Sequence, residues 1–386
     1  MQLLDVGLYI HVPFCQVRCS YCDFNTYAGL GHLIDDYVAA LCTEIQQRST
    51  SHPYRAITIY FGGGTPSLLT GAHLDRILTS CYDAFAIADD VEITIEANPG
   101  TVSLDSLRAM RHLGVNRLSL GVQSLDDAML RLLDRLHNAE QAREAYIAAR
   151  QAGFGNINLD FMYGLPGQTV EHWRQTLAQA IALQADHLSL YALTLEKHVP
   201  MARRVAAGGL TLPDDDTVAD MYTLAEDMLG DAGYLHYEIS NWAKINHGSN
   251  VPCFISRHNS LYWQRRPYLG FGAGAHSFDG RRRFSNVLHP RRYIEKVNAT
   301  GSAEVESETI TPQIAMAETM FLSLRLLQEG VTADDFTARH GQSWDIFAAQ
   351  IRELSDLGLL EQRNGRLLLT RRGRLLSNQV FVRFLP

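Results

Sequence analysis

The chain has 386 residues, of which 20% are charged and 46% are hydrophobic, and its formal net charge at pH 7 is −8. This composition is that of an ordinary globular protein, and the negative charge excludes a generally basic nucleic-acid coat protein. The first residues lack the features of a signal peptide, and no apolar run approaches the roughly 18 residues that span a bilayer. We therefore expect a soluble, cytoplasmic protein of two or three domains without a nucleic-acid partner.

Six short apolar runs alternate with helical patterns between residues 8 and 191. The expected strands are 8–11, 57–61, 91–96, 117–122, 156–162 and 187–191. Strands separated by helices pair in parallel through right-handed crossovers. The alternation predicts an α/β fold, either a partial (βα)6 barrel of the TIM type or an open doubly wound sheet. In both folds the functional residues gather at the carboxyl ends of the strands.

The pattern changes after a first domain that we place at residues 1–240. Residues 241–305 have weak periodicity, and we expect an irregular connecting segment there. In residues 306–386 helices return, and a helix at 344–357 is followed by two short strands around Asn364-Gly365, a dipeptide favoured in tight hairpins. This order predicts a small, winged-helix-like α+β domain. Its last 36 residues are basic, but the acidic chain as a whole argues against a DNA-binding role.

Three of the six cysteines lie within eight residues, as Cys15-x3-Cys19-x2-Cys22. In a reducing cytosol such a group favours metal binding over disulfides. Three thiolates are one too few for a closed zinc site, but they suit a [4Fe–4S] cluster with one iron left open for chemistry. A zinc site that borrows a distant ligand is the alternative. The others are two expected core thiols and one undecided loop thiol: Cys42, Cys81 and Cys253.

Polar or glycine-containing segments follow every expected strand. After the cysteine loop they are Gly62-Gly-Gly-Thr-Pro66, Glu96-x-Asn-Pro99, Gln123-Ser124, Asp160-x3-Gly-Leu-Pro-Gly167 and Ala192. Together with Tyr9-Ile-His11 ahead of the cysteines, this set resembles the radical S-adenosylmethionine (SAM) superfamily. The resemblance is to its HemN/HemW branch and covers essentially the whole chain. It implies a radical-SAM partial barrel followed by an accessory domain that packs near the substrate opening.

The resemblance also implies how a cluster and SAM would be held. The three loop cysteines would bind three irons, and SAM would chelate the fourth. Glycines let the backbone pass close to the methionine amino group. Glu96 and Asp160 would accept hydrogen bonds from ribose hydroxyls or an amino group, and Arg135 would pair with a carboxylate. The expected SAM-binding residues are Tyr9, Tyr21, Gly63, Gly64, Thr65, Glu96, Gln123, Arg135, Asp160 and Ala192.

One position departs from the coproporphyrinogen oxidases of this branch. They carry a further cysteine two residues after the third cluster ligand, where this chain has Phe24. The sequence Cys-Asp-Phe instead resembles the HemW subgroup, which is understood as haem chaperones that keep the SAM machinery. Phe24 disfavours the oxidase reaction without excluding another radical reaction, so enzymatic activity and the catalytic residues stay open.

A second HemW-like feature is His258-Asn259-Ser-Leu-Tyr262-Trp263. In that subgroup the HNxxYW motif is proposed to bind haem. Histidine is a common axial ligand of haem iron, and Tyr262 and Trp263 could stack on the macrocycle. His276 is an alternative iron ligand. Arginines that could pair with the propionates are Arg265, Arg266 and Arg281 to Arg283.

These features lead to the hypothesis of a HemW-like haem chaperone that binds a [4Fe–4S] cluster, SAM and haem. It would deliver haem to respiratory or other haem proteins, receive electrons from a donor such as flavodoxin or ferredoxin, and approach the membrane peripherally through its acceptor. The alternative is a radical-SAM enzyme that acts on a porphyrin. Examples are an oxygen-independent coproporphyrinogen III oxidase and a haem-modifying methyltransferase.

Overall fold

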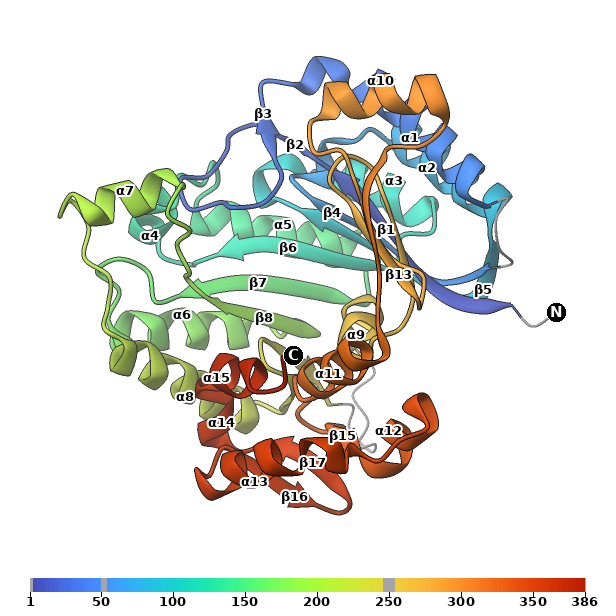
Figure 1. The fold of residues 1–386 in the computed structure, drawn as a ribbon. Coiled ribbons are helices and arrows are strands. Elements are labelled where there is room, and N and C mark those ends of the chain that lie inside the picture. Colours follow the sequence, from blue (N-terminus) through green and yellow to red (C-terminus); the bar gives the residue numbers. More distant parts are fainter. Residues whose placement is uncertain (1–2, 50–53, 246–253, 386) are drawn as a thin grey trace.

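The computed structural model describes residues 3–49, 54–245 and 254–385. Six parallel strands form the wall of a partial barrel in the order β1-β4-β5-β6-β7-β8 (Figure 1). Their bounds are β1 (Leu4–Val12), β4 (Tyr54–Gly63), β5 (Ala86–Ala97), β6 (Arg117–Gln123), β7 (Ile157–Tyr163) and β8 (His187–Ala192). The predicted partial (βα)6 barrel is therefore confirmed.

Helices connect the strands and cover the outside of the barrel (Figure 1). They are α1 (Ile34–Ser49), α2 (Gly71–Ala84), α3 (Leu104–His112), α4 (Asp127–Leu132), α5 (Ala139–Gln151), α6 (Val170–Ala182), α7 (Pro200–Ala206) and α8 (Asp215–Asp231). Side-chain caps fix several helix starts, as at α2, where the Thr70 hydroxyl accepts from the backbone N–H of His73. One continuous apolar core joins the strands to these helices.

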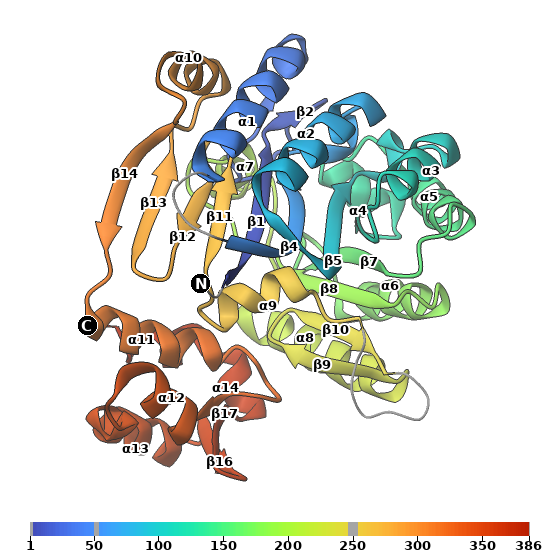
Figure 2. The same cartoon turned by 90° about the vertical axis from the view of Figure 1, so that its right-hand side faces the viewer.

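The expectation of an irregular segment at 241–305 was wrong, because the described part of this segment extends the sheet at both edges. On one edge β10 (Asn241–Lys244) pairs antiparallel with β8 and with β9 (Tyr234–Glu238). On the other edge β11 (Tyr268–Phe271) pairs parallel with β1. Figure 2 shows the sheet continuing through β12 (His276–Phe278), β13 (Arg282–Asn286) and β14 (Glu304–Thr309). Two helices, α9 (Arg257–Trp263) and α10 (Pro290–Thr300), interrupt these strands.

The predicted C-terminal domain has its own apolar core. Its elements are α11 (Pro312–Ser323), β15 (Val331–Thr332), α12 (Ala333–His340), α13 (Ala348–Asp356), β16 (Leu360–Arg363), β17 (Arg366–Leu369), α14 (Arg371–Leu375) and α15 (Ser377–Val382). The hairpin turns at Asn364 and Gly365, whose φ angles of 53° and 75° are those of a type I′ turn. The first strand of its three-stranded sheet lies between α11 and α12, and the other two follow α13, which is a winged-helix-like order.

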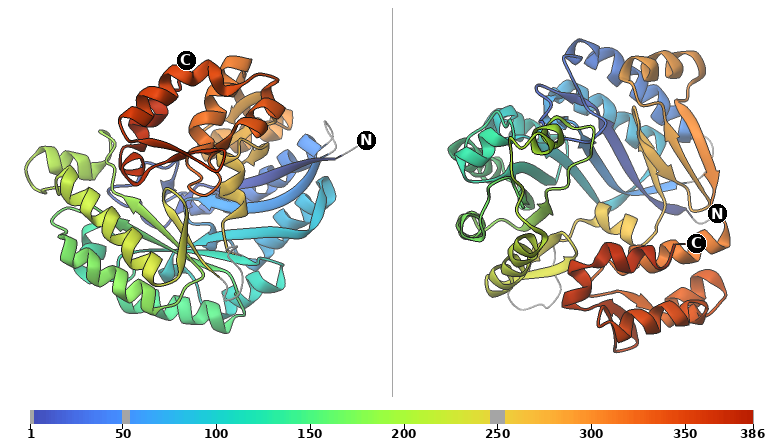
Figure 3. Two further views of the ribbon diagram at one scale, coloured as in Figure 1. Left: turned by 90° about the horizontal axis from the view of Figure 1, so that it is seen from below. Right: turned by 60° about the vertical axis from the view of Figure 1, so that its left-hand side comes forward.

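The C-terminal domain lies beside α8 and α9 (Figure 3), and ion pairs join it to the barrel. Arg374 lies 2.7 Å from Glu226 of α8, and Arg265 at the end of α9 lies 2.8 Å from Glu318 of α11. Part of the basic charge of this terminus is therefore paired with a carboxylate of the barrel. Among the helices that the structure describes, none is long and apolar enough to cross a membrane.

Candidate cluster and cofactor site

The cysteine loop lies at the carboxyl end of β1, and its three thiols are partly exposed. Each thiol has a polar neighbour: the Thr65 hydroxyl lies 3.6 Å from the Cys15 Sγ, Arg135 Nη1 lies 3.7 Å from the Cys19 Sγ, and the Thr26 hydroxyl lies 3.8 Å from the Cys22 Sγ. Burial raises the pKa of Cys15, the Thr65 hydroxyl lowers it, and the neighbouring thiols raise it further. A cluster that binds the thiolates would offset this cost, because iron–sulfur clusters are held by deprotonated cysteines.

The three thiols do not form a site for a single ion. Within the described residues, no group of three His, Cys, Asp or Glu side chains could hold one metal ion. In a cubane cluster, by contrast, each cysteine binds a separate iron. Of the remaining cysteines, Cys81 is fully buried and Cys42 is partly buried against the core, as expected, while Cys253 lies outside the described residues.

Glu96 ends β5 and faces the interior of the barrel. Its carboxylate accepts hydrogen bonds from the Tyr60 hydroxyl at 2.8 Å and from the backbone N–H of Gly63 at 3.1 Å. Burial raises the pKa of Glu96 to about 7, against the lowering effect of Tyr60, and nearby Asp160 raises it further. Such a shifted carboxyl in a cavity wall is typical of a functional site. Ribose hydroxyls would supply further donors to its charged form.

Arg135 lies between the cluster loop and two strand ends. Its Nη2 donates to the backbone carbonyl of Gly121 at 2.7 Å and to the Asn98 side chain, while its Nη1 points to the Cys19 thiol. Its Nε is buried without a partner among the described residues. A carboxylate beside this guanidinium would complete its hydrogen bonding, so the residue fits the expected role.

The glycine segment after β4 passes unusually close to β1 and the cysteine loop. A Cβ on Gly64 would lie 2.6 Å from the carbonyl oxygen of Phe14, so no larger residue fits there. The N–H groups of Gly64 and Thr65 are already bonded to Val12 and Phe14, both at 2.8 Å. The amino group of the SAM methionine is a donor, and it would therefore hydrogen-bond to the backbone carbonyls of this segment and not to its N–H groups.

The other expected SAM-binding residues occupy varied places around the strand ends. Asp160 accepts from Asn158 at 2.8 Å and from Ser119 at 3.0 Å, and burial raises its pKa. Gln123 follows a bulge in β6 and has a left-handed φ of 66°, a strained conformation often found at functional sites. The remaining three are Tyr9, partly buried in the barrel, Tyr21 in the cluster loop and Ala192, exposed at the end of β8.

A cavity of about 400 Å³ opens beside the cluster loop. This volume is within the usual range of ligand pockets. Its lining comprises Tyr9, His11, Phe24, Asn25, Gly63, Glu96, Tyr262, Tyr268, Gly274 and His276. The cavity therefore joins expected SAM-binding residues to Phe24 and to part of the HNxxYW motif. A smaller cavity on the other side of the cluster loop includes Cys19, Thr65, Asn98 and Arg135 in its lining.

The HNxxYW motif forms helix α9, and its members do not share one environment. His258 is 1% exposed and projects into the barrel, with Nδ1 2.7 Å from the Thr58 hydroxyl and Nε2 2.8 Å from the Tyr262 hydroxyl. Burial lowers the pKa of His258 to about 3, so its ring is neutral. Trp263 stacks under the Arg325 guanidinium at 4.1 Å, in the contact with the C-terminal domain. Of the four motif residues, only Tyr262 lines the cavity.

Most of the arginines considered for the propionates have carboxylate partners already. Glu318 binds both Arg265 and Arg283, and Arg282 lies 2.9 Å from Glu304. Arg266 lies 3.6 Å from Asp5. These charges mainly connect β13 and α9 to their neighbours.

The motif pattern of the sequence underrated three contributors to the site. Asn98 bonds both Thr65 and Arg135, and Asn25 joins the cluster loop to the loop before β12 through the carbonyl of Ala273 at 3.0 Å. Asn98 could have been found from its place in the segment after β5. Asn25 offers no local signal, because its role arises from a contact with a loop far along the chain. The buried Arg117 offers none either, because its role is electrostatic: its charge opposes the effect of burial on the pKa of Glu96 and of Asp160.

Comparison with known proteins agrees with this geometry. Residues 9–180 match the family model for the radical SAM superfamily, and residues 310–376 match the HemN C-terminal domain. Two relatives named heme chaperone HemW, from Bacillus subtilis (strain 168) and Escherichia coli (strain K12), are each 36% identical to this chain. The alignments cover 98% of this chain and 98% of the Bacillus protein, and 100% of this chain and 99% of the Escherichia protein.

A solved structure also has the same fold along nearly the whole chain. Coproporphyrinogen III oxidase (HemN) from Escherichia coli, described as a radical SAM enzyme, is 25% identical with a TM-score of 0.85. The superposition covers 99% of this chain and 90% of that one. The partial barrel and the C-terminal domain therefore have counterparts in a solved structure.

Proposed function

Because this chain belongs to the HemW family of radical SAM proteins, we propose that it is a haem chaperone. It would bind a [4Fe–4S] cluster and SAM at the strand ends, take up haem in the neighbouring cavity, and transfer it to an acceptor such as a respiratory haem protein. A flavodoxin or ferredoxin would supply electrons to the cluster. The acceptor, rather than this chain, would provide any contact with a membrane.

The observation that carries the proposal is the cavity of about 400 Å³ beside the cluster loop. Its lining includes Glu96 and Gly63, which suit a polar nucleoside, and the aromatic rings of Phe24, Tyr262 and Tyr268. Aromatic walls with a few polar groups are typical of sites for large, flat, mostly apolar ligands. This lining supports haem binding next to the expected SAM-binding residues.

The chain's own residues would hold the two cofactors as follows. Cys15, Cys19 and Cys22 would bind three irons, and Arg135 would neutralise the SAM carboxylate. Glu96 would orient the ribose. When bound, the cluster supplies an electron to the sulfonium of SAM, and the protein orients the reactants and excludes water. The HNxxYW residues His258, Asn259, Tyr262 and Trp263 would support the haem end of the cavity.

A second candidate function rests on the likeness to coproporphyrinogen III oxidase. The conserved architecture and the retained SAM residues would also suit a radical reaction on a porphyrin. Phe24, which is 69% exposed at the cavity, argues against it, because the oxidases have a cysteine at this position of the motif.

Anaerobic reconstitution followed by three assays on one sample tests the proposal. Haem is titrated by Soret absorbance, SAM cleavage is followed with and without haem, and conversion of coproporphyrinogen is measured. We expect one haem per chain, transfer of haem to an apo-acceptor, and no coproporphyrinogen turnover. Sustained turnover, or failure to bind haem in stoichiometric amounts, would overturn the chaperone assignment.

A further inference from the structure

We propose that His276, rather than His258, is the haem-iron ligand, and that Phe24 packs against the macrocycle. This inference rests on the proposed haem binding and specifies its site. The cavity beside the cluster loop is lined by two histidines, His11 and His276, and not by His258. An iron ligand must present a free ring nitrogen to the space that holds the haem, which allows these residues to be compared directly.

His258 and His11 have no ring nitrogen to spare. The His258 ring is enclosed between Thr58 and Tyr262, and either nitrogen would have to break a hydrogen bond of 2.7 or 2.8 Å to reach iron. The His11 ring is bonded at both nitrogens, to the Tyr9 hydroxyl and to the Asn25 carbonyl, each at 3.0 Å. Both histidines are buried.

His276 differs on each point. It is exposed, it lines the cavity, and no residue in the described part of the chain forms a hydrogen bond with its imidazole. It begins β12, the short strand between β11 and β13. An imidazole with a free nitrogen on a cavity wall is a chemical group that haem iron binds.

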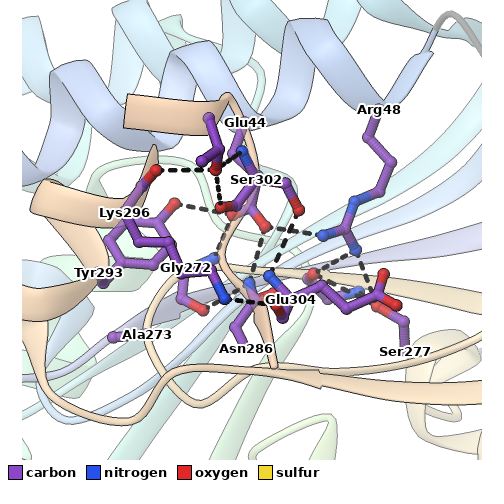
Figure 4. A network of polar contacts seen from close by, with 12 residues as sticks. Glu44, Arg48, Gly272, Ala273, Ser277, Asn286, Tyr293, Lys296, Ser302 and Glu304 are labelled. Atoms are coloured by element: carbon purple, nitrogen blue, oxygen red, sulfur yellow. Dashed lines mark hydrogen bonds and ion pairs between the residues drawn. The ribbon is translucent and has the colours of Figure 1, made fainter. Parts of the chain in front are cut away.

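Hydrogen bonds from buried side chains fix the backbone just ahead of His276, and Figure 4 shows the network around Glu44, Gly272 and Asn286. The buried Glu44 carboxylate accepts from the backbone N–H of Gly272 at 2.9 Å, and the Asn286 side chain donates to the Gly272 carbonyl at 2.9 Å. The Ala273 N–H donates to the Tyr37 hydroxyl at 2.8 Å. A ligand placed on such a fixed loop needs little ordering when the metal arrives.

The cluster loop supplies the second half of the proposed site. Phe24 follows the last cluster cysteine by two residues, lines the same cavity as His276, and is 69% exposed. A flat apolar ligand would cover this ring. Asn25 links the two halves, because its side chain donates to the carbonyls of Ala273 and Leu288, both at 3.0 Å. Haem bound here would touch the cluster loop and the His276 loop together.

Spectroscopy of matched histidine variants tests the assignment. Three variants of the full-length reconstituted protein are compared: His276→Gly, His258→Gln and His112→Ala. His112→Ala is the control, because His112 is an exposed residue of α3 far from the cavity. Ferrous haem complexes are examined by resonance Raman for the iron–histidine stretch, and affinities come from Soret titration. In His276→Gly we expect loss of the stretch and at least a tenfold weaker affinity, about the minimum cost of disturbing a metal ligand. Added imidazole should restore the ligation spectrum.

The other variants separate ligation from support. His258→Gln and His112→Ala should retain the iron–histidine stretch. Phe24→Ala should weaken haem binding but leave the frequency of that stretch unchanged. An unchanged stretch in His276→Gly, or its loss in a His258→Gln protein that melts normally, would overturn the assignment while leaving haem binding intact. A wild-type protein that binds haem without histidine ligation would also overturn it. A wild-type protein that binds no haem would refute the proposed function itself.

Discussion

Replacing Glu96 with Gln should stabilise the folded protein at alkaline pH and destabilise it at acid pH. In the folded protein the pKa of this carboxyl is raised from 4.5 to about 7, chiefly by burial. The folded state therefore holds the Glu96 proton more tightly than the unfolded state. Ionisation of this carboxyl does not lower the free energy of unfolding below pH 4.5. It lowers that free energy increasingly between pH 4.5 and 7, and by a constant amount above pH 7.

The structure gives the size of the effect. The difference between 4.5 and about 7 corresponds to about 3 kcal/mol of unfavourable free energy at alkaline pH. An amide has only one acceptor oxygen, so either the Tyr60 hydroxyl or the Gly63 N–H loses its partner, at about 1 kcal/mol. Glu96→Gln should thus stabilise the apoprotein by about 2 kcal/mol at pH 8 and destabilise it by about 1 kcal/mol near pH 4.5.

Urea unfolding of the apoprotein at both pH values measures this reversal. Glu361→Gln, an exposed change in β16, serves as the control. SAM binding by the reconstituted protein should weaken in Glu96→Gln but not in the control. If the difference in unfolding free energy between Glu96→Gln and wild type is the same at both pH values, then the carboxyl does not titrate near 7 and the reasoning fails.

Three further substitutions test other parts of the structure. Glu44→Ala should lower the free energy of unfolding by about 3–5 kcal/mol, because it removes the ion-pair partner of Arg48 and the acceptor of the Gly272 N–H and the Tyr293 hydroxyl, and a change below about 1 kcal/mol would contradict this. Cys19→Ala should lose the brown cluster in iron and sulfide assays, and a full iron complement would refute the triad. Arg325→Met removes the cation 3.6 Å from buried Glu238 and should cost about 3 kcal/mol, seen as easier proteolysis of the C-terminal domain. Unchanged proteolysis would show that this contact does not hold the domain.

The barrel could be predicted from the sequence because its strands are long and locally marked. The six strands are six to twelve residues long and each contains an apolar run; the cysteine loop follows the first strand, and glycine or polar segments follow the next four. The same holds for the C-terminal hairpin, where Asn364-Gly365 determines the turn by itself. In both cases the signal lies within a few consecutive residues.

The edge strands could not be predicted for the opposite reason. β10, β11, β12 and β13 are three to five residues long, too short to show a period of two clearly. β11 pairs with β1, which precedes it by more than 250 residues, so the interaction that makes it a strand is invisible locally. The weak periodicity of residues 241–305 therefore reflected short strands and not irregular structure.

The contacts of the HNxxYW motif determine which measurement can identify the haem ligand. His258 contacts β4 through Thr58 and the cavity wall through Tyr262, while Trp263 contacts Arg325 of the C-terminal domain. A substitution in α9 therefore disturbs the barrel interior, the cavity and a domain contact together. Weaker haem binding by a His258 variant would follow from any of these changes and would not identify the ligand. Only the ligation spectrum distinguishes a residue that binds iron from one that shapes the cavity, so affinity alone cannot assign the site.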